Sequence, residues 1–274
     1  MLLMVLISAT ALFLFFAAFL YFSQERLIFF PTREISATPA DVGLSFDDLR
    51  IAASGDERIN AWYLRSRDSA VASPATVLYC HGNGGNLSHR VITAEFLTRL
   101  GVDVLLFDYR GYGLSDGRPS ESNMYADAEA AYRWLVQEKG VAPDRLFLFG
   151  RSIGGAVVVD LAGKVPCAGV VVESAMTSAA DVGARMYPFM PIRLLIRYRF
   201  DALARIGSLR CPVLVTHSPE DEIIPFDMGR ALYERAPEPK LFIPLSGRHN
   251  ERAYYDSDIY INGLREFFGY TQGR

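Results

Sequence analysis

From residue 75 onward the chain repeats one pattern, in which a short and continuously apolar run is followed by a longer amphipathic stretch. The apolar runs occupy residues 75–80, 102–108, 145–150, 168–174, 212–218 and 240–245. Strands that are apolar on both faces belong inside a parallel sheet, and amphipathic stretches between them suit helices that cover the sheet. The pattern therefore predicts an α/β fold with a mostly parallel sheet.

The remaining segments complete this prediction. Residues 45–65 alternate apolar and polar side chains and predict a hairpin, which adds antiparallel strands at the start of the sheet. Together these runs predict an eight-stranded sheet. Helices are expected over 87–100, 121–139, 153–164, 226–235 and 251–268, with Gly140 as a C-cap.

Residues 2–22 contain no charge, glycine or proline. As a helix they would extend about 31 Å, the thickness of a bilayer core. A cleaved signal peptide would have a basic leading segment and a shorter apolar core, so an uncleaved transmembrane anchor is favoured. We expect an anchor over 1–23, a juxtamembrane linker over 24–40 and the main folded domain over 41–274.

The orientation of the anchor is only weakly indicated. Arg26 and Arg33 follow the apolar run, each beside a glutamate, and no charged side chain precedes it. Basic residues are retained on the cytoplasmic side of a membrane, so these two arginines favour a cytoplasmic location for the main domain.

Charge and cysteine content exclude several classes of function. The net charge of −3 argues against a nucleic-acid-binding surface, which needs a basic excess. Cys80, Cys167 and Cys211 form neither a disulfide framework nor a metal-ligand spacing, and they are expected to be buried as small apolar residues. Cys167 and Cys211 lead into neighbouring predicted strands, so a bridge between them is conceivable in an oxidising compartment.

The segment Gly150-Arg151-Ser152-Ile153-Gly154 matches the G-x-S-x-G motif of a nucleophilic serine. The motif is common by chance, and its chemistry needs a sharp turn between a strand and a helix. Both neighbours are present here, because an apolar run precedes the motif and an apolar helical stretch follows it. We therefore predict that Ser152 is the nucleophile of an α/β-hydrolase fold.

A glycine-rich turn, His81 to Asn86, follows the strand over 75–80. It lacks the Lys-Ser/Thr ending of a phosphate-binding P-loop and the spacing of a dinucleotide fingerprint. Its position after this strand predicts one half of an oxyanion hole. The expected donors are the backbone N–H groups of Asn83 and Ile153, and His81 is expected to brace the turn.

The general base must come from four histidines. In an α/β-hydrolase the nucleophile, the acid and the histidine follow one another in sequence, which excludes His81 and His89. His217 ends an apolar run and is expected to be a strand-end residue. His249 lies in a short loop between the last strand and the last helix, so it is the predicted base.

The acid is expected after the strand over 212–217, where three carboxylates stand in a row. Asp221 precedes the apolar pair Ile223-Ile224 and is expected to turn inward, whereas Glu220 and Glu222 are expected to face water. Glu173, at the end of the preceding strand, is the alternative.

These motifs together resemble one family. HGNGGN, the segment DYRGYGLSDG at residues 108–117, DEIIP, GRHN and the juxtamembrane segment RLIFFP are similar to those of membrane-anchored alpha/beta-hydrolase-domain serine hydrolases. The resemblance covers nearly the whole chain. It implies a triad of Ser152, Asp221 and His249, esterase or thioesterase activity on acyl substrates, and no metal or organic cofactor. Arg248 departs from the family, in which a smaller residue is expected; it either affects substrate charge preference or points outward.

Residues 174–211 leave room only for a short cap. The cap is rich in bulky apolar residues and carries Arg193, Arg197 and Arg199. It either lines an acyl pocket and dips toward the membrane, where the arginines meet anionic headgroups, or packs on the core with solvated arginines.

A serine esterase, lipase or thioesterase is the favoured function, and its expected partners are a membrane and an acyl ester or thioester, either a lipid or an acylated protein. A peptidase or amidase is disfavoured because the chain has no large accessory domain. A catalytically silent binding protein is disfavoured because every chemical group of the reaction is present. An aspartate nucleophile would indicate a dehalogenase or epoxide hydrolase, and position 152 is serine.

Overall fold

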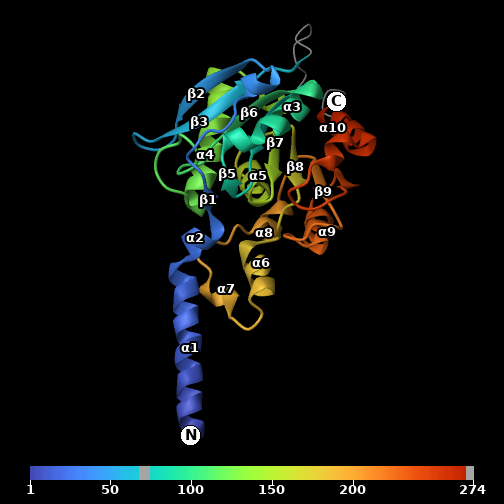
Figure 1. The fold of residues 1–274 in the computed structure, drawn as a ribbon. Coiled ribbons are helices and arrows are strands. Elements are labelled where there is room, and N and C mark those ends of the chain that lie inside the picture. The colour runs from blue at the N-terminus through green and yellow to red at the C-terminus, as the bar shows by residue number, and fades with distance from the viewer. Residues whose placement is uncertain (68–74, 270–274) are drawn as a thin grey trace.

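The computed structural model describes residues 1–67 and 75–269 (Figure 1). Its centre is an eight-stranded sheet of order β10-β9-β8-β7-β4-β6-β3-β2. In chain order the strands are β2 (Phe46–Ala52), β3 (Arg58–Leu64), β4 (Thr76–Cys80), β6 (Asp103–Phe107), β7 (Leu146–Arg151), β8 (Gly169–Glu173), β9 (Val213–His217) and β10 (Lys240–Pro244).

The sheet confirms the predicted α/β-hydrolase architecture. Strands β2 and β3 form the expected antiparallel hairpin, β3 is also antiparallel to β6, and all other neighbours are parallel. Every residue of β4, β7, β8 and β9 is buried, which explains why these strands appear in the sequence as unbroken apolar runs.

Helices cover both faces of the sheet. Side chains of α4 (Glu121–Arg133), α5 (Ile153–Ala162), α8 (Ala202–Ile206) and α9 (Phe226–Arg235) pack on one face. Those of α3 (Val91–Arg99) and α10 (Asp258–Gly269) pack on the other. Alternate residues of each strand face the two cores, so that Leu78 and Tyr79 of β4 belong to opposite sides.

Two of the predicted helices are not α-helical throughout. The stretch 87–100 begins as a 3-10 turn (Leu87–Arg90), and 121–139 ends in a π-helical turn (Trp134–Glu138) before Gly140. Gly140 has a φ of 76°, as its predicted capping position requires. Short 3-10 turns also occupy Pro39–Val42 and Pro143–Arg145.

The prediction of one helix over 251–268 was wrong. A 3-10 turn occupies Ala253–Asp256, Ser257 is extended, and α10 begins at Asp258. The break has a packing reason, because it allows the hydroxyl groups of both Tyr254 and Tyr260 to reach the carboxylate of Glu173.

Helix α1 (Leu2–Phe22) projects from the body of the protein (Figure 1). Within the described residues it is the one helix long and apolar enough to cross a membrane, with a mean hydropathy of 2.6 over its most apolar window. The predicted linker contains α2 (Gln24–Ile28) and the two-residue strand β1 (Phe30–Pro31). Strand β1 pairs in parallel with β5 (Gly84–Gly85), which lies in the HGNGGN turn.

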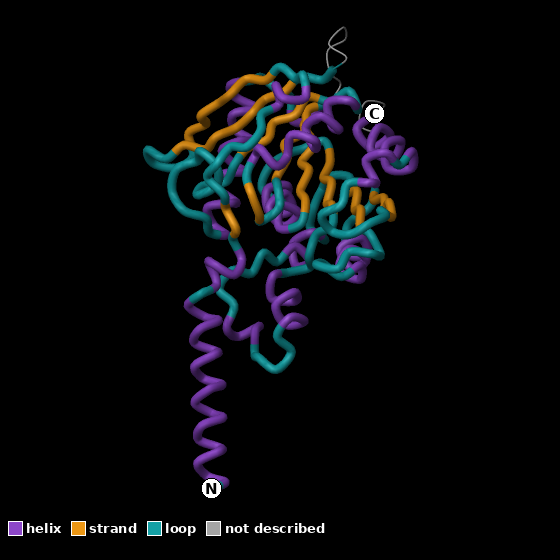
Figure 2. The backbone as a smooth tube through the Cα atoms, viewed as in Figure 1, coloured by secondary structure: helices purple, strands orange, loops and turns teal. Residues whose placement is uncertain are grey.

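The predicted cap lies between β8 and β9. It contains α6 (Ala179–Met186), α7 (Ile192–Leu195) and α8. Figure 2 shows α6 and α7 as a helical hairpin that extends from the domain beside the C-terminal part of α1. We call residues 179–195 the cap hairpin.

Candidate active site

Ser152 lies in the turn between β7 and α5, where its φ of 56° and ψ of −123° are strained for a residue with a side chain. Such a conformation costs about 1–3 kcal/mol and persists only where the surrounding structure enforces it. A Cβ on Gly150 would collide with the carbonyl oxygen of Gly154, and a Cβ on Gly154 would collide with that of Cys80. The two glycines therefore allow α5 to start directly against β7 and β4, which raises Ser152 above the sheet.

The HGNGGN turn lies next to this serine. An ideal Cβ built on Gly82 would be 3.5 Å from the Cβ of Ser152. Asn83 and Ile153, the predicted oxyanion donors, line the same cavity as Ser152. Within the described residues, neither of their backbone N–H groups donates to another protein group, so both are free to donate a hydrogen bond to a ligand oxygen.

The segment that follows α1 holds this turn in place. The N–H of Phe30 donates to the carbonyl oxygen of Asn83 over 3.1 Å, and the Asn83 side-chain amide donates to the carbonyl oxygen of Ile28 over 2.8 Å. The hydroxyl of Tyr112 also donates to the Asn83 carbonyl, over 2.8 Å. The sequence had not indicated this support, because strand β1 has only two residues.

His81 is buried beneath the turn. Its Nδ1 lies 2.6 Å from the carbonyl oxygen of Gly82, and its Nε2 lies 3.5 Å from the carboxylate of Asp108. Burial lowers the pKa of His81, so the ring is neutral at ordinary pH. These contacts fit the bracing role predicted for it.

Asp221 and His249 lie in contact. The Nδ1 atom of His249 is 2.7 Å from Oδ2 of Asp221, and the other carboxylate oxygen accepts the N–H groups of Ile223 and Ile224 over 3.0 and 2.8 Å. Burial by itself would raise the pKa of Asp221, but hydrogen bonds from His217, His249 and Ile224 outweigh it and hold the pKa well below its ordinary value. The carboxylate is therefore ionised and fixed, as an orienting acid requires.

Ser152 and His249 line one cavity, and no hydrogen bond joins their side chains within the described residues. In enzymes of this type the bond between nucleophile and base is often long until a substrate binds.

His217 ends strand β9, as predicted, and also contacts the acid. Its Nε2 lies 2.8 Å from the carbonyl oxygen of Ile224 and 3.4 Å from Oδ2 of Asp221. Sequence reasoning missed this second contact, since nothing in the local pattern relates the end of a strand to a turn four residues later.

Glu173, the alternative acid, belongs to a separate buried network. Its carboxylate accepts the hydroxyl groups of Tyr254, over 3.0 Å, and Tyr260, and lies 3.3 Å from Nε of Arg151. The guanidinium of Arg151 in turn donates to the backbone carbonyl oxygen of His249. Glu173 thus acts on the histidine loop through Arg151, a residue that the sequence analysis had treated only as the variable position of the motif.

Arg248 points outward. Its side chain is 64% exposed, and its Nε lies 3.4 Å from the carboxylate of Glu222. Glu222 is exposed, as is Glu220, and it also accepts the backbone N–H of His249 over 3.0 Å. Of the two roles considered for Arg248, the structure supports the outward one.

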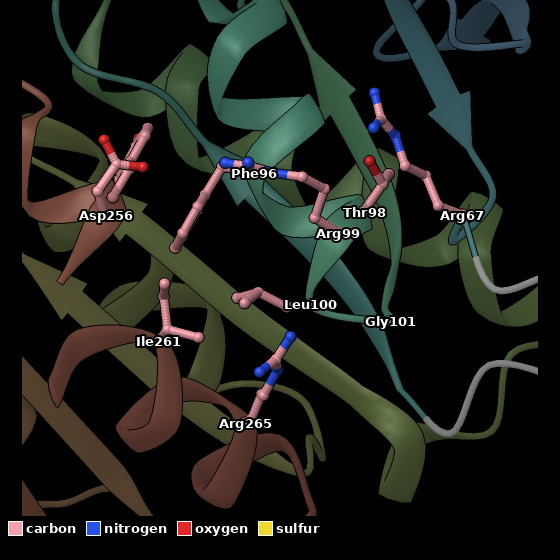
Figure 3. Close-up of a pocket in the computed structure, with 10 residues that line it drawn as sticks. Arg67, Phe96, Thr98, Arg99, Leu100, Gly101, Asp256, Ile261 and Arg265 are labelled. Atoms are coloured by element: carbon pink, nitrogen blue, oxygen red, sulfur yellow. The ribbon is translucent and has the colours of Figure 1, made fainter. Parts of the chain in front are cut away.

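The cavity that contains Ser152 has a volume of about 770 Å³. Its lining is largely apolar and includes residues from α1, α2, α6 and α7, so the cap does line a pocket. A second cavity, of about 630 Å³, lies between α3 and α10 (Figure 3). Arg67, Arg99 and Arg265 line it, and none of the described residues in its lining is a serine, cysteine or histidine, so we assign the chemistry to the first cavity.

Cys80 and Cys211 are buried and Cys167 is partly buried. The sulfur atoms of Cys167 and Cys211 lie 3.5 Å apart and are not bonded, so the conceivable bridge is not formed in this structure. Among the residues that the structure describes, no group of three or more histidine, cysteine, aspartate or glutamate side chains is arranged to hold a metal ion.

Comparisons with known proteins identify relatives among hydrolases. A hydrolase family model described as serine aminopeptidase, S33, matches residues 72–200. An uncharacterized protein of Mycobacterium tuberculosis is 39% identical over 254 residues, which are 92% of this chain and 90% of that protein. Mouse alpha/beta hydrolase domain-containing protein 17C is 36% identical over 222 residues, 78% of this chain and 65% of that protein.

Solved structures share the fold. The Pyrococcus furiosus esterase Pf2001 has a TM-score of 0.72 at 21% identity, over 88% of this chain and 98% of that one. A puromycin-hydrolyzing peptidase of M. tuberculosis has a TM-score of 0.64 at 19% identity, over 84% of this chain and 40% of that one.

Proposed function

The chain belongs to the alpha/beta-hydrolase family, and we propose that it is a serine hydrolase that cleaves carboxylic ester or thioester bonds of acyl substrates. The observation that carries the proposal is the 2.7 Å contact between His249 Nδ1 and Asp221, beside a serine held in a strained turn. Ser152 lines the same cavity as this base.

The proposed reaction has two steps. The Nε2 atom of His249 removes the proton of Ser152 as Oγ attacks the acyl carbon, and Asp221 holds the imidazole by its other nitrogen. The backbone N–H groups of Asn83 and Ile153 donate hydrogen bonds that stabilise the negative charge developing on the acyl oxygen. The C–O or C–S bond then breaks, and His249 returns the proton to the leaving alcohol or thiol. Water, activated by His249, releases the acid from the acyl-enzyme. None of these steps calls for a metal or organic cofactor.

We also propose that α1 anchors the enzyme in a membrane. Its side chains are mostly exposed and apolar, and the contacts with the rest of the described chain are made near its C-terminal end, at Phe16 and Leu20. On the evidence of Arg26 and Arg33 the catalytic domain would face the cytoplasm. Two reporters fused to the C-terminus test the orientation, one active only in the cytoplasm and one active only outside it. A signal from the second reporter would contradict a cytoplasmic catalytic domain.

The family model's description raises a peptidase as a second candidate. An aminopeptidase must bind the charged amine of its substrate, for which a carboxylate close to the serine is the natural partner. None of the described residues that line the cavity is an aspartate or glutamate. An apolar lining favours an acyl group instead.

Labelling with a fluorophosphonate, which reacts with activated serines, tests the proposal. We expect the wild type to be labelled and Ser152→Ala and His249→Gln to be unlabelled. Ser208→Ala, which alters an exposed serine outside the cavity, should label normally. A folded wild type that remains unlabelled would point to a catalytically silent binding protein. A faster rate on aminoacyl amides than on esters would favour the peptidase.

A further inference from the structure

The cavity that contains Ser152 extends away from the catalytic residues to the membrane anchor. At its catalytic end it is lined by Gly82, Ser152 and His249, and at its far end by Leu20, Leu27 and Leu195. The far end is therefore formed by α1, α2 and the cap hairpin. Among the described residues that line this end, none carries a charge, so this end suits a hydrocarbon chain.

Leu20 is the single buried side chain of α1, with 6% exposed. It lies in the last turn of the helix, where it lines the cavity. The anchor is thus more than a tether, because one of its side chains forms part of the wall of the catalytic cavity.

Gln24 joins the anchor to the cap hairpin. Its side chain is buried; its amide nitrogen donates to the carbonyl oxygen of Leu195 over 2.9 Å, and its amide oxygen accepts the N–H of Arg197 over 2.7 Å. The rings of Phe16 and Tyr187 also meet edge to face, 6.2 Å apart. These contacts hold the two segments together at the far end of the cavity.

The outer surface of the cap hairpin exposes several large apolar side chains. Phe189 is 93% exposed, Leu194 is 86% exposed and Met186 is 67% exposed. The hairpin lies beside the C-terminal part of α1 (Figure 1), so a bilayer that surrounds α1 also receives these side chains. Arg193, which we had considered for headgroup binding, is paired instead with Asp181 at 2.7 Å.

From these observations we infer that the far end of the cavity is an acyl-chain site built partly by the membrane anchor, and that a long acyl chain enters it from the bilayer between α1 and the cap hairpin. This inference rests on the proposed function. The substrate is then a bilayer-resident ester or thioester whose chain passes Leu20 and whose carbonyl group reaches Ser152.

The experiment uses the full-length protein in phosphatidylcholine vesicles with p-nitrophenyl esters of increasing chain length. For the wild type, kcat/KM should rise by up to about fourfold for each added methylene until the cavity is filled. Leu20→Trp should lower kcat/KM on the dodecanoyl ester by about tenfold or more, equivalent to the exclusion of roughly two methylenes, and leave the butyryl ester nearly unchanged.

Leu12→Trp is the matched control, because Leu12 lies on the same helix and is 69% exposed. It should behave as the wild type on both esters. Met186→Trp provides a second obstruction at a partly exposed position, where a larger side chain can be accommodated without unfolding. The inference would be overturned if Leu20→Trp and Met186→Trp each lowered kcat/KM equally on both esters, or if the wild-type kcat/KM did not depend on chain length. Either result would leave the proposed serine hydrolase intact. Absence of any Ser152-dependent hydrolysis would overturn both.

The route through the bilayer has its own test. Phe189→Asp places a charge at the exposed end of the cap hairpin, and Ile259→Asp places one at a residue that is 70% exposed on α10. Only Phe189→Asp should slow hydrolysis of the dodecanoyl ester in vesicles, and neither should affect the soluble butyryl ester. Equal vesicle activity in the two variants would exclude entry beside the hairpin.

Discussion

The side-chain amide of Asn83 donates a 2.8 Å hydrogen bond to the carbonyl oxygen of Ile28. This bond links the turn that is proposed to stabilise the oxyanion to the segment that leads out of α1. The pairing of β1 with β5 strengthens the link. The segment that follows α1 therefore contributes to the position of the proposed catalytic groups, although it contains none of them.

We expect Asn83→Ala to lower kcat by about tenfold, because the backbone N–H of residue 83 remains but is less firmly held against the oxyanion. The KM for a soluble ester should change little. Asn123→Ala is the matched control, since it removes an amide hydrogen bond to the carbonyl oxygen of Arg118 in an exposed turn. Steady-state kinetics in detergent micelles measure both, and an unchanged kcat for Asn83→Ala would contradict the positioning role.

Arg151→Lys should lower kcat by about 10–100-fold at nearly constant KM. A lysine keeps the charge but lacks the fork that reaches both Glu173 and the carbonyl oxygen of His249. Tyr260→Phe is the comparison, because it removes one hydrogen bond on Glu173 without touching Arg151. If the two variants lose activity in proportion to their loss of thermal stability, Arg151 is structural only.

Asp221→Asn should lower kcat by about 10⁴-fold, since an amide in place of the carboxylate favours the wrong tautomer of His249. Glu173→Gln should cost far less activity, because Glu173 does not contact the imidazole. Single-turnover rates with a p-nitrophenyl ester measure the difference. A greater loss in Glu173→Gln would reassign the acid.

The pKa of Asp221 also predicts a pH dependence of stability. Because hydrogen bonds hold this pKa below the value of an unfolded aspartate, about 3.9, the stabilisation is present above that value and is lost as the pH falls toward the folded-state pKa. We therefore expect Asp221→Asn to destabilise the protein less at about pH 3 than at about pH 5. Urea unfolding followed by tryptophan fluorescence compares the two; equal effects at both pH values would refute the assignment.

Gly154→Ala should prevent normal folding, because its Cβ would collide with the backbone of Cys80 in the neighbouring strand. Gly163→Ala is the control at the other end of α5, where the nearest atom would lie 3.4 Å away and φ is −70°. Gly163→Ala should leave the melting temperature unchanged or slightly raise it. Thermal scans of the two purified variants measure their melting temperatures. A stable Gly154→Ala protein would show that the turn can relax.

Much of the fold could be predicted because its signals are local. The predicted runs at 145–150 and 212–218 overlap the strands Leu146–Arg151 and Val213–His217, in which every residue is buried, and α9 begins and ends at the predicted residues. The helix expected at 251 was misplaced because its start depends on where Tyr254 and Tyr260 find a partner. That partner, Glu173, is distant in sequence, and periodicity carries no information about it.

The sequence by itself determined the order of the strands along the chain, the serine turn with its two glycines, and the residue types from which an acid and a base could be chosen. Those features follow from backbone geometry and from burial patterns over a few residues. Only the tertiary structure decided that Asp221 rather than Glu173 contacts His249, that Arg151 holds the histidine loop, and that Leu20 and Gln24 of the anchor region reach the catalytic cavity. Each of these contacts joins segments that are far apart in the chain, so their formation depends on how the sheet and its loops pack in space.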